Sequence, residues 1–149
     1  DLTGRPVFVL VGQRFPARDI DPDKAIMHVI NVMDSAVHVP YVLVYVHTNF
    51  SVTSNQPVPT WFPRVHEALD RRYKKNLKQL LILHPSVTSG AVLLGLRALL
   101  SAKFWRKVAY CNKVSDLHSF IRKDQLILPP SVELYEKEQA GAFGSLFPW

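Results

Sequence analysis

VFVLV at residues 7–11 and YVLVYV at residues 41–46 are short, continuous apolar runs in which β-branched valine dominates. Runs of this length and composition predict strands that are covered on both faces of a sheet. Between them, Asp21 is placed to cap a helix and Pro22 to occupy its first position. The spacing of Ile26, Val29, Ile30, Met33 and Val37 then predicts one apolar face of that helix. The order strand, helix, strand follows.

The same alternation continues along the chain. We expect a third strand at residues 80–83 and a fourth at 108–111, with helices over about 60–78, 88–104 and 115–121. Alternating strands and helices predict an α/β fold. Its form is a three-layer α/β/α sandwich, with a mostly parallel sheet and helices on both faces.

Size and composition indicate one globular domain. The chain has 149 residues, of which 48% are hydrophobic and 20% charged, so a long disordered protein is excluded. A lone cysteine, Cys111, excludes an internal disulfide and a multi-cysteine zinc site. We interpret residues 1–149 as a single domain with a core of about 4–138, followed by a tail at 139–149 without periodic pattern. A cytoplasmic location is the default expectation for such a chain.

Two loops or turns are candidates for function. Residues 48–60 form a connection rich in Asn, Ser and Pro, which is either functional or a plain surface loop. His84 follows the third strand, and ligands of open α/β sheets gather beyond the carboxyl ends of strands. His84 therefore either contacts a ligand or fixes the turn at Pro85.

Catalytic signatures are missing from the sequence. It contains no Gly-x-Ser-x-Gly elbow, no Gly-x-Gly-x-x-Gly fingerprint, no Walker lysine and no His-Glu-x-x-His pair. We therefore expect a non-enzymatic protein without a cofactor or a metal.

The segment 88–102 is apolar around most of the circumference of its predicted helix, with Arg97 as its only charge. It is too short to span a bilayer. An all-round apolar helix must be covered by protein or by an apolar ligand. We therefore expect either a buried crossover helix or the wall of a lipid cavity. The candidate ligand contacts are Val92, Leu93, Leu96, Leu99 and Leu100, joined by Phe104 and His84.

Positive charge is concentrated in the middle of the chain. The net charge is +6, and residues 61–128 hold thirteen Lys and Arg against four Asp and Glu. Such a field attracts anionic membranes and acidic proteins; we do not expect a nucleic acid as the partner. The candidate contacts form two groups, Arg71, Lys74, Lys75 and Lys78 on one helix stripe, and Lys103, Arg106 and Lys107 interleaved with Phe104 and Trp105. The alternative for the stripe is a helix face that is exposed to solvent and has no binding role.

Several segments in order resemble a known family. They are Gly4-Arg5-Pro6-Val7, residues 41–48, residues 70–78, Leu81-Ile82-Leu83-His84-Pro85, and Lys103-Phe104 ahead of Val108-Ala109-Tyr110. Together they resemble the divergent CRAL-TRIO lipid-binding domain over about residues 4–138, in the branch that includes BCH domains. The resemblance implies an α/β/α sandwich whose apolar cavity holds a lipid or another hydrophobic molecule without catalysis. It also implies that the helix at 88–102 acts as a mobile gate.

Two functions follow as expectations. The first is a module that binds a hydrophobic ligand or a phospholipid and associates peripherally with anionic membranes. The alternative is a protein-interaction module with a collapsed cavity, whose basic surface docks an acidic partner such as a small GTPase. The sequence does not separate them, because filled and collapsed cavities are lined by the same residue types.

Overall fold

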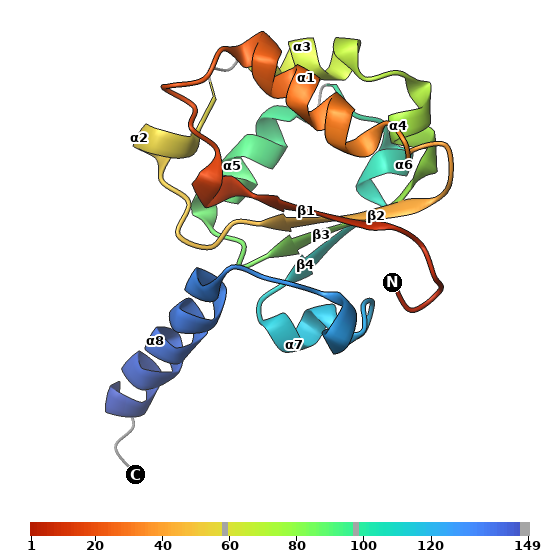
Figure 1. Cartoon of the computed structure of the whole chain (residues 1–149). Helices are drawn as coiled ribbons and strands as arrows, with labels where there is room; N and C mark the ends of the chain where they lie inside the picture. Colours follow the sequence, from red (N-terminus) through yellow and green to blue (C-terminus); the bar gives the residue numbers. More distant parts are fainter. Residues whose placement is uncertain (58–59, 97–98, 147–149) are drawn as a thin grey trace.

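Four parallel strands form the single sheet of the computed structural model, which describes residues 1–57, 60–96 and 99–146 (Figure 1). The strands are β1 (Val7–Val11), β2 (Tyr41–Val46), β3 (Leu77–Leu83) and β4 (Val108–Cys111), and they lie in sequence order. Their pairing is parallel throughout. All four predicted strands and the α/β class are confirmed, although β3 begins earlier than expected.

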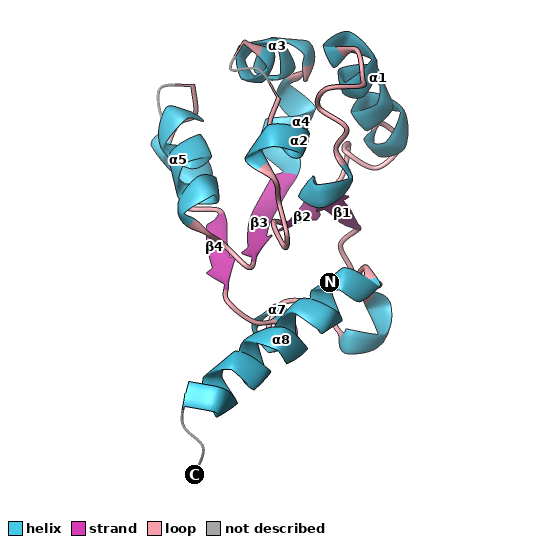
Figure 2. Cartoon of the chain, turned by 90° about the vertical axis from the view of Figure 1, so that its left-hand side faces the viewer, coloured by secondary structure: helices cyan, strands magenta, loops and turns pink. Residues whose placement is uncertain are grey.

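Strand order explains the layers. When parallel strands follow each other in sequence order, right-handed crossovers place every connection on the same side of the sheet. That side, the helical face, carries α1 (Pro22–Met33), α3 (Trp61–Ala68), α4 (Arg71–Asn76), α5 (Val87–Leu96) and α6 (Ala102–Trp105) (Figures 1 and 2).

The chain after β4 covers the other side, the opposite face. There lie α7 (Val114–Leu117), η2 (Lys123–Gln125) and the start of α8 (Pro130–Leu146). Two short elements, η1 (Gly12–Arg14) and α2 (Val52–Asn55), follow the carboxyl ends of β1 and β2. The three-layer sandwich is therefore confirmed. No helix in the described part of the chain is long and apolar enough to cross a bilayer.

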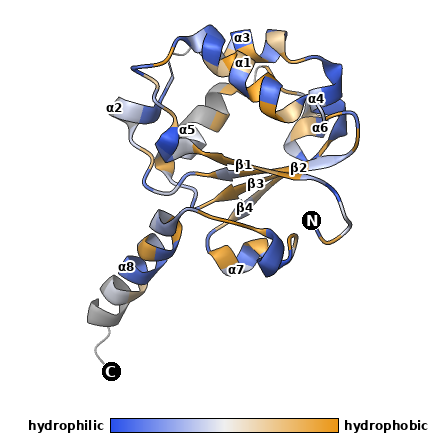
Figure 3. Cartoon of the chain, in the orientation of Figure 1, coloured by the Kyte–Doolittle hydropathy of each residue, from blue (hydrophilic) through white to orange (hydrophobic). Residues whose placement is uncertain are grey.

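Alternation along the strands separates two cores, and Figure 3 shows that hydrophobic residues are concentrated along the strands and the helix faces near them. The core of the opposite face contains Val42, Val44, Val46, Leu81, Leu83, Cys111, Leu117, Ile121 and Val132. The core of the helical face contains Met33, Val37, Tyr41, Tyr73 and Leu77. Side chains at odd and even strand positions thus reach different layers.

The first helix begins as the sequence predicts. Asp21 accepts hydrogen bonds from the backbone N–H groups of Asp23 and Lys24, and Pro22 is the first helical residue. This cap satisfies N–H groups that have no partner inside the helix.

The predicted continuous helix over 60–78 is wrong. The chain forms α3 and α4, and Asp70 between them caps α4 by accepting a hydrogen bond from the Arg72 N–H. A local Asp side chain competes with helix continuation in this way. Lys78 consequently lies in β3 instead of on the helical stripe.

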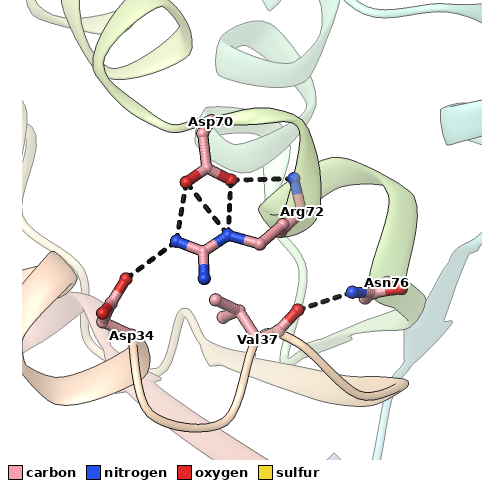
Figure 4. A network of polar contacts seen from close by, with 5 residues as sticks. All are labelled: Asp34, Val37, Asp70, Arg72 and Asn76. Atoms are coloured by element: carbon pink, nitrogen blue, oxygen red, sulfur yellow. Dashed lines mark hydrogen bonds and ion pairs between the residues drawn. The ribbon is translucent and has the colours of Figure 1, made fainter.

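Figure 4 shows what holds α4 against the end of α1. Arg72 pairs with Asp70 at 2.8 Å and with Asp34 at 3.1 Å, and Asn76 donates to the Val37 carbonyl at 2.6 Å. The guanidinium group of Arg72 is therefore already paired with two carboxylates of the same chain.

Three further segments differ in detail from the expected elements. The helix over 88–104 is divided into α5 and α6, and Ser101 caps α6 by accepting from the Phe104 N–H. The tail expected from 139 onward is helical through Leu146, because α8 continues. The short helix expected at 115–121 is confined to α7.

Candidate functional site

An apolar cavity of about 230 Å³ lies between the helical face, η1 and helices α3 and α5. The sheet supplies its floor through alternating positions of β2 and the neighbouring strands, and α5 supplies Leu93 and Leu96. The lining comprises Leu10, Gly12, Phe15, Leu43, Tyr45, His47, Phe50, Asn55, Gln56, Pro57, Trp61, Phe62, Leu80, Ile82, Ser89, Leu93 and Leu96. None of these side chains carries a fixed charge.

The loop after β2 is part of this cavity. Asn55 is buried and donates to the carbonyls of Gln13 and Phe15 at 2.8 and 2.9 Å, while its side-chain oxygen accepts from the Ser51 N–H. These bonds hold α2 against η1. The Phe15 ring in turn lies 5.4 Å from the ring of Trp61. The described part of the 48–60 loop therefore has a defined position in the cavity wall.

Polar groups of the lining residues near the end of β2 are bonded within the wall, and the surface that faces the cavity is almost wholly apolar. Tyr45 Oη and His47 Nδ1 are hydrogen-bonded at 2.9 Å, and His47 Nε2 is bonded to Ser86 Oγ at 2.9 Å. The imidazole also stacks on Phe50, with ring centroids 4.6 Å apart. Burial lowers the pKa of His47 and raises the pKa of Tyr45 to about 12. Both groups are therefore uncharged near neutral pH.

The volume of the cavity sets the size of its ligand. Typical pockets for drug-sized molecules measure about 300–1,000 Å³, and a dry cavity of about 150 Å³ accepts benzene. At about 230 Å³, this cavity fits a compact apolar group or one short chain. A whole two-chain phospholipid does not fit in it.

A second hollow, the cationic pocket, lies between the end of α3, α4 and the segment around α6. It measures about 330 Å³ and is lined by His66, Arg71, Lys74, Lys75, Leu99, Leu100, Ser101, Lys103, Phe104 and Lys107. Cations from two separate segments converge here, and no acidic side chain is among the lining residues.

Two of the cations of this pocket, Lys74 and Lys107, are held by backbone carbonyls. Lys107 Nζ donates to the Lys74 carbonyl at 3.0 Å, and Lys74 Nζ donates to the His66 carbonyl at 3.1 Å. Burial lowers the pKa of Lys107, and the positive charges of Lys103 and Lys78 lower it further. An anion in the pocket would relieve this repulsion.

The predicted site residues divide between the two hollows. Leu93 and Leu96 line the cavity, whereas Leu99, Leu100 and Phe104 line the cationic pocket. The predicted cations Arg71, Lys74, Lys75, Lys103 and Lys107 come together in that pocket, while Lys78 and Arg106 lie outside its lining. The side chain of Val92 lies outside the described residues. The binding roles of these residues stay predictions.

His84 is not among the lining residues of these two hollows, and the ligand contact expected for it stays a prediction. Its Nδ1 lies 2.6 Å from Thr48 Oγ1, and its Nε2 lies 3.0 Å from Glu136 Oε1. The Tyr135 ring is 4.5 Å away. With φ of 53°, His84 also adopts the left-handed conformation that turns the chain at Pro85. These contacts join the end of β3 to α8.

The sequence interpretation missed Tyr45, His47 and the aromatic wall. A signal exists in β2, where positions 42, 44 and 46 are all valine but 41, 43, 45 and 47 are Tyr, Leu, Tyr and His. In a strand these two sets face different layers. The varied, partly polar set therefore indicates the face of the sheet whose role goes beyond packing of the hydrophobic core.

The described residues contain no group of three His, Cys, Asp or Glu side chains that could hold a metal ion.

Known proteins with similar sequences include Rho GTPase-activating proteins and GDAP2 homologs. Rho GTPase-activating protein gacY of Dictyostelium discoideum is 35% identical over 148 residues, which cover 97% of this chain and 20% of that protein. The protein GDAP2 homolog of Drosophila melanogaster is 36% identical over 141 residues, 95% of this chain and 26% of the relative. Mouse Rho GTPase-activating protein 8 is 32% identical over 139 residues, 93% of this chain and 32% of the relative.

The chain thus spans about a fifth to a third of the length of these relatives. The finer expectation of a BCH-like branch stays a prediction. The family model of the divergent CRAL/TRIO domain matches residues 4–138. That match covers all four strands and both hollows, and with the parallel α/β/α fold it establishes that the chain belongs to the divergent CRAL/TRIO domain family.

Proposed function

We propose that the chain is a non-enzymatic binding module that holds a hydrophobic ligand in the cavity beneath α3 and α5. The observation that carries this proposal is the cavity itself, about 230 Å³ in volume and lined without a charged side chain. Moving apolar ligand surface out of water contributes about 25 cal/mol per Å². Membership of the divergent CRAL/TRIO family supports the same function.

The proposal includes reversible association with anionic membranes, through the cationic pocket. Arg71, Lys75 and Lys103 are exposed there beside the apolar side chains Leu99 and Leu100. Each basic residue near an anionic bilayer contributes about 1 kcal/mol. The pocket therefore supports adsorption from the cytoplasmic side, in which the cations contact headgroups and the leucines approach the acyl boundary.

The cationic pocket also supports a second candidate function, docking of an acidic protein surface such as that of a small GTPase. Two of the relatives named above are Rho GTPase-activating proteins, and electrostatic complementarity speeds the encounter of such partners. This function needs the cations but not the cavity.

Filling the cavity tests the first proposal. Leu96→Trp places an indole against the cavity lining, whereas Leu134→Trp, on an exposed position of α8, is the matched control. We expect the wild type and the control to bind naphthalene saturably, measured by its fluorescence, and Leu96→Trp to bind it at least tenfold more weakly.

Urea unfolding of each variant shows whether the fold is intact. Equal naphthalene affinity of folded Leu96→Trp and wild type would reject the cavity as the ligand site. Loss of GTPase or vesicle binding in folded Leu96→Trp would show that these functions depend on the cavity. That result would contradict their assignment to the cationic pocket.

A further inference from the structure

The outer edge of β4 presents backbone groups that have no partner in the described part of the chain. β4 is the last strand in the order β1-β2-β3-β4, and among the described strands only β3 pairs with it (Figure 2). The Leu80 N–H of β3 donates to the Lys107 carbonyl at 2.9 Å. Because backbone groups alternate in direction along a strand, those of Val108 and Tyr110 point away from β3. An open edge of this kind is a template for an added strand.

The open part of this edge is short. Asp116 accepts hydrogen bonds from the N–H groups of Asn112 and Lys113 at 3.0 and 3.1 Å, so the edge is closed beyond β4. The N–H and C=O groups of Val108 and Tyr110 are left for a partner. An extended segment of a few residues fits such a stretch.

Tyr110 gives an added strand a side chain to pack against, because it is 55% exposed. Its neighbours Ala109 and Cys111 pack in the core of the opposite face. The Tyr110 side chain therefore points to the helical face, the same side as the cationic pocket. An aromatic side chain favours a β-branched neighbour on the adjacent strand. The edge thus favours valine, isoleucine or threonine beside Tyr110.

Charge indicates which kind of segment fits this edge. Ten Lys and Arg and no Asp or Glu lie between Asp70 and Asp116. Arg106 lies shortly before β4 and Lys113 shortly after it, and both residues are exposed. Within the described part of the chain, neither of them forms an ion pair. Carboxylates at the two ends of an added strand would therefore meet an unpaired cation at each end.

The same charges disfavour a second copy of the chain at this edge. Two β4 edges paired in antiparallel orientation would bring Arg106 of one copy close to Lys113 of the other, and parallel pairing would align identical cations. Like charges at directly opposed positions destabilise strand pairing. An acidic segment has the opposite effect.

We propose that the outer edge of β4 binds an extended acidic segment of a partner protein, which adds to the sheet as a further strand. The segment carries a β-branched residue beside Tyr110 and carboxylates near Arg106 and Lys113. This inference goes beyond the proposed ligand binding, because neither Val108 nor Tyr110 lines the cavity. It needs neither a bound ligand nor a membrane.

Backbone amide exchange measured by NMR tests the pairing directly. The probe is the peptide EEVTVEE. Its control is the same peptide with N-methyl groups on the threonine and the valine after it, which keeps the charge but removes N–H groups from both edges of the strand.

We expect saturating EEVTVEE to slow solvent exchange of the Val108 and Tyr110 N–H groups about tenfold or more, and the N-methylated peptide to leave them unchanged. The Val9 N–H is the internal control. It points away from β2 at the other edge of the sheet, because the Val42 N–H donates to the Pro6 carbonyl. Its exchange should change by less than about twofold.

Charge reversal tests the acidic character of the segment. Arg106→Glu with Lys113→Glu should weaken EEVTVEE binding about tenfold or more at low salt, measured by the fluorescence anisotropy of labelled peptide. Lys24→Glu with Lys123→Glu changes the net charge equally at exposed positions of other elements, and should weaken binding less than about threefold. Urea unfolding shows whether both variants are folded.

Slowed exchange at Val9 in place of Val108 and Tyr110, equal binding of the N-methylated peptide, or equal losses in the two charge-reversed pairs would each overturn strand addition at β4. So would a failure of EEVTVEE to bind, or equal protection of these amides by phosphatidylserine vesicles, which carry charge but no strand. None of these outcomes alters naphthalene binding in the cavity, so the proposed function is tested separately.

Discussion

At the scale of single residues, Glu136 is one of the α8 residues that attach this helix to the rest of the fold. Its Oε1 accepts from the Val114 N–H at 2.6 Å and lies 3.0 Å from His84 Nε2. His84 is buried, with a side chain 2% exposed, so removing Glu136 takes away the partner of a buried ring nitrogen.

We therefore expect Glu136→Ala to lower the free energy of unfolding by about 1–3 kcal/mol, the cost of leaving buried polar groups without partners. Urea denaturation measures this change. Glu138→Ala, at an exposed position of the same helix, should change stability by less than about 0.5 kcal/mol. Equal effects of the two substitutions would show that the His84 contact contributes nothing.

His47 predicts a pH dependence. Burial lowers its pKa in the folded state from the ordinary 6.5, so folding opposes its protonation. The corresponding stability is present above about pH 6.5 and is lost as the pH falls through the folded-state pKa. We expect the wild type to lose more unfolding free energy than His47→Gln between about pH 7.5 and pH 5. Parallel pH profiles of the two proteins would contradict the assignment to His47.

The structure also shows what residue patterns alone could not establish for His84. Its position at the end of a strand was correctly read from the sequence. Which layer its ring enters depends on the left-handed turn at His84 and on Glu136, fifty-two positions later in the chain. Long-range partners of this kind leave no local signal.

At the scale of elements, α7 covers the opposite face of the sheet. Leu117 is fully buried in the core of the opposite face, while Leu134 of α8 is 58% exposed. We expect Leu117→Ala to cost about 2–5 kcal/mol of unfolding free energy and Leu134→Ala less than about 0.5 kcal/mol. Thermal and urea unfolding test both. A small effect at Leu117 would mean that α7 is not part of the core.

The cationic pocket predicts salt-dependent adsorption. Reversing two of its charges, Lys75→Glu with Lys103→Glu, should weaken binding to phosphatidylserine-containing vesicles roughly tenfold or more at low salt. The matched pair Lys24→Glu with Lys123→Glu changes the net charge equally at exposed positions outside the pocket. Cosedimentation across a salt series measures the difference, which should shrink as the ions screen it. Identical losses in the two pairs would indicate a diffuse field rather than a pocket.

Element boundaries were less predictable than element types. The predicted cationic stripe requires one helix from 60 to 78. That helix is predicted because the apolar residues there repeat at helical spacing. The repeat continues across Asp70, but that side chain caps a new helix, and Leu77 enters β3. Tertiary pairing of β3 with β2 decides this boundary, and periodicity does not contain that information.

At the scale of the whole molecule, the topology of the sheet explains why both hollows lie on the helical face. Sequence-order parallel strands place every crossover on the helical face, where both the cavity and the cationic pocket occur. The α/β class and the parallel sheet were predictable from alternating apolar runs. The size of the cavity was not, because it depends on how closely α3 and α5 approach the sheet.

The central claim is that the cavity beneath α3 and α5 is the ligand site, and methyl NMR with added naphthalene tests it most directly. Leu10, Leu43, Leu80, Leu93 and Leu96 line the cavity, whereas Leu81, Leu83 and Leu117 lie in the core of the opposite face. We predict saturable chemical-shift changes in the first set and almost none in the second. No saturable change, or changes of equal size in both sets, would contradict the account.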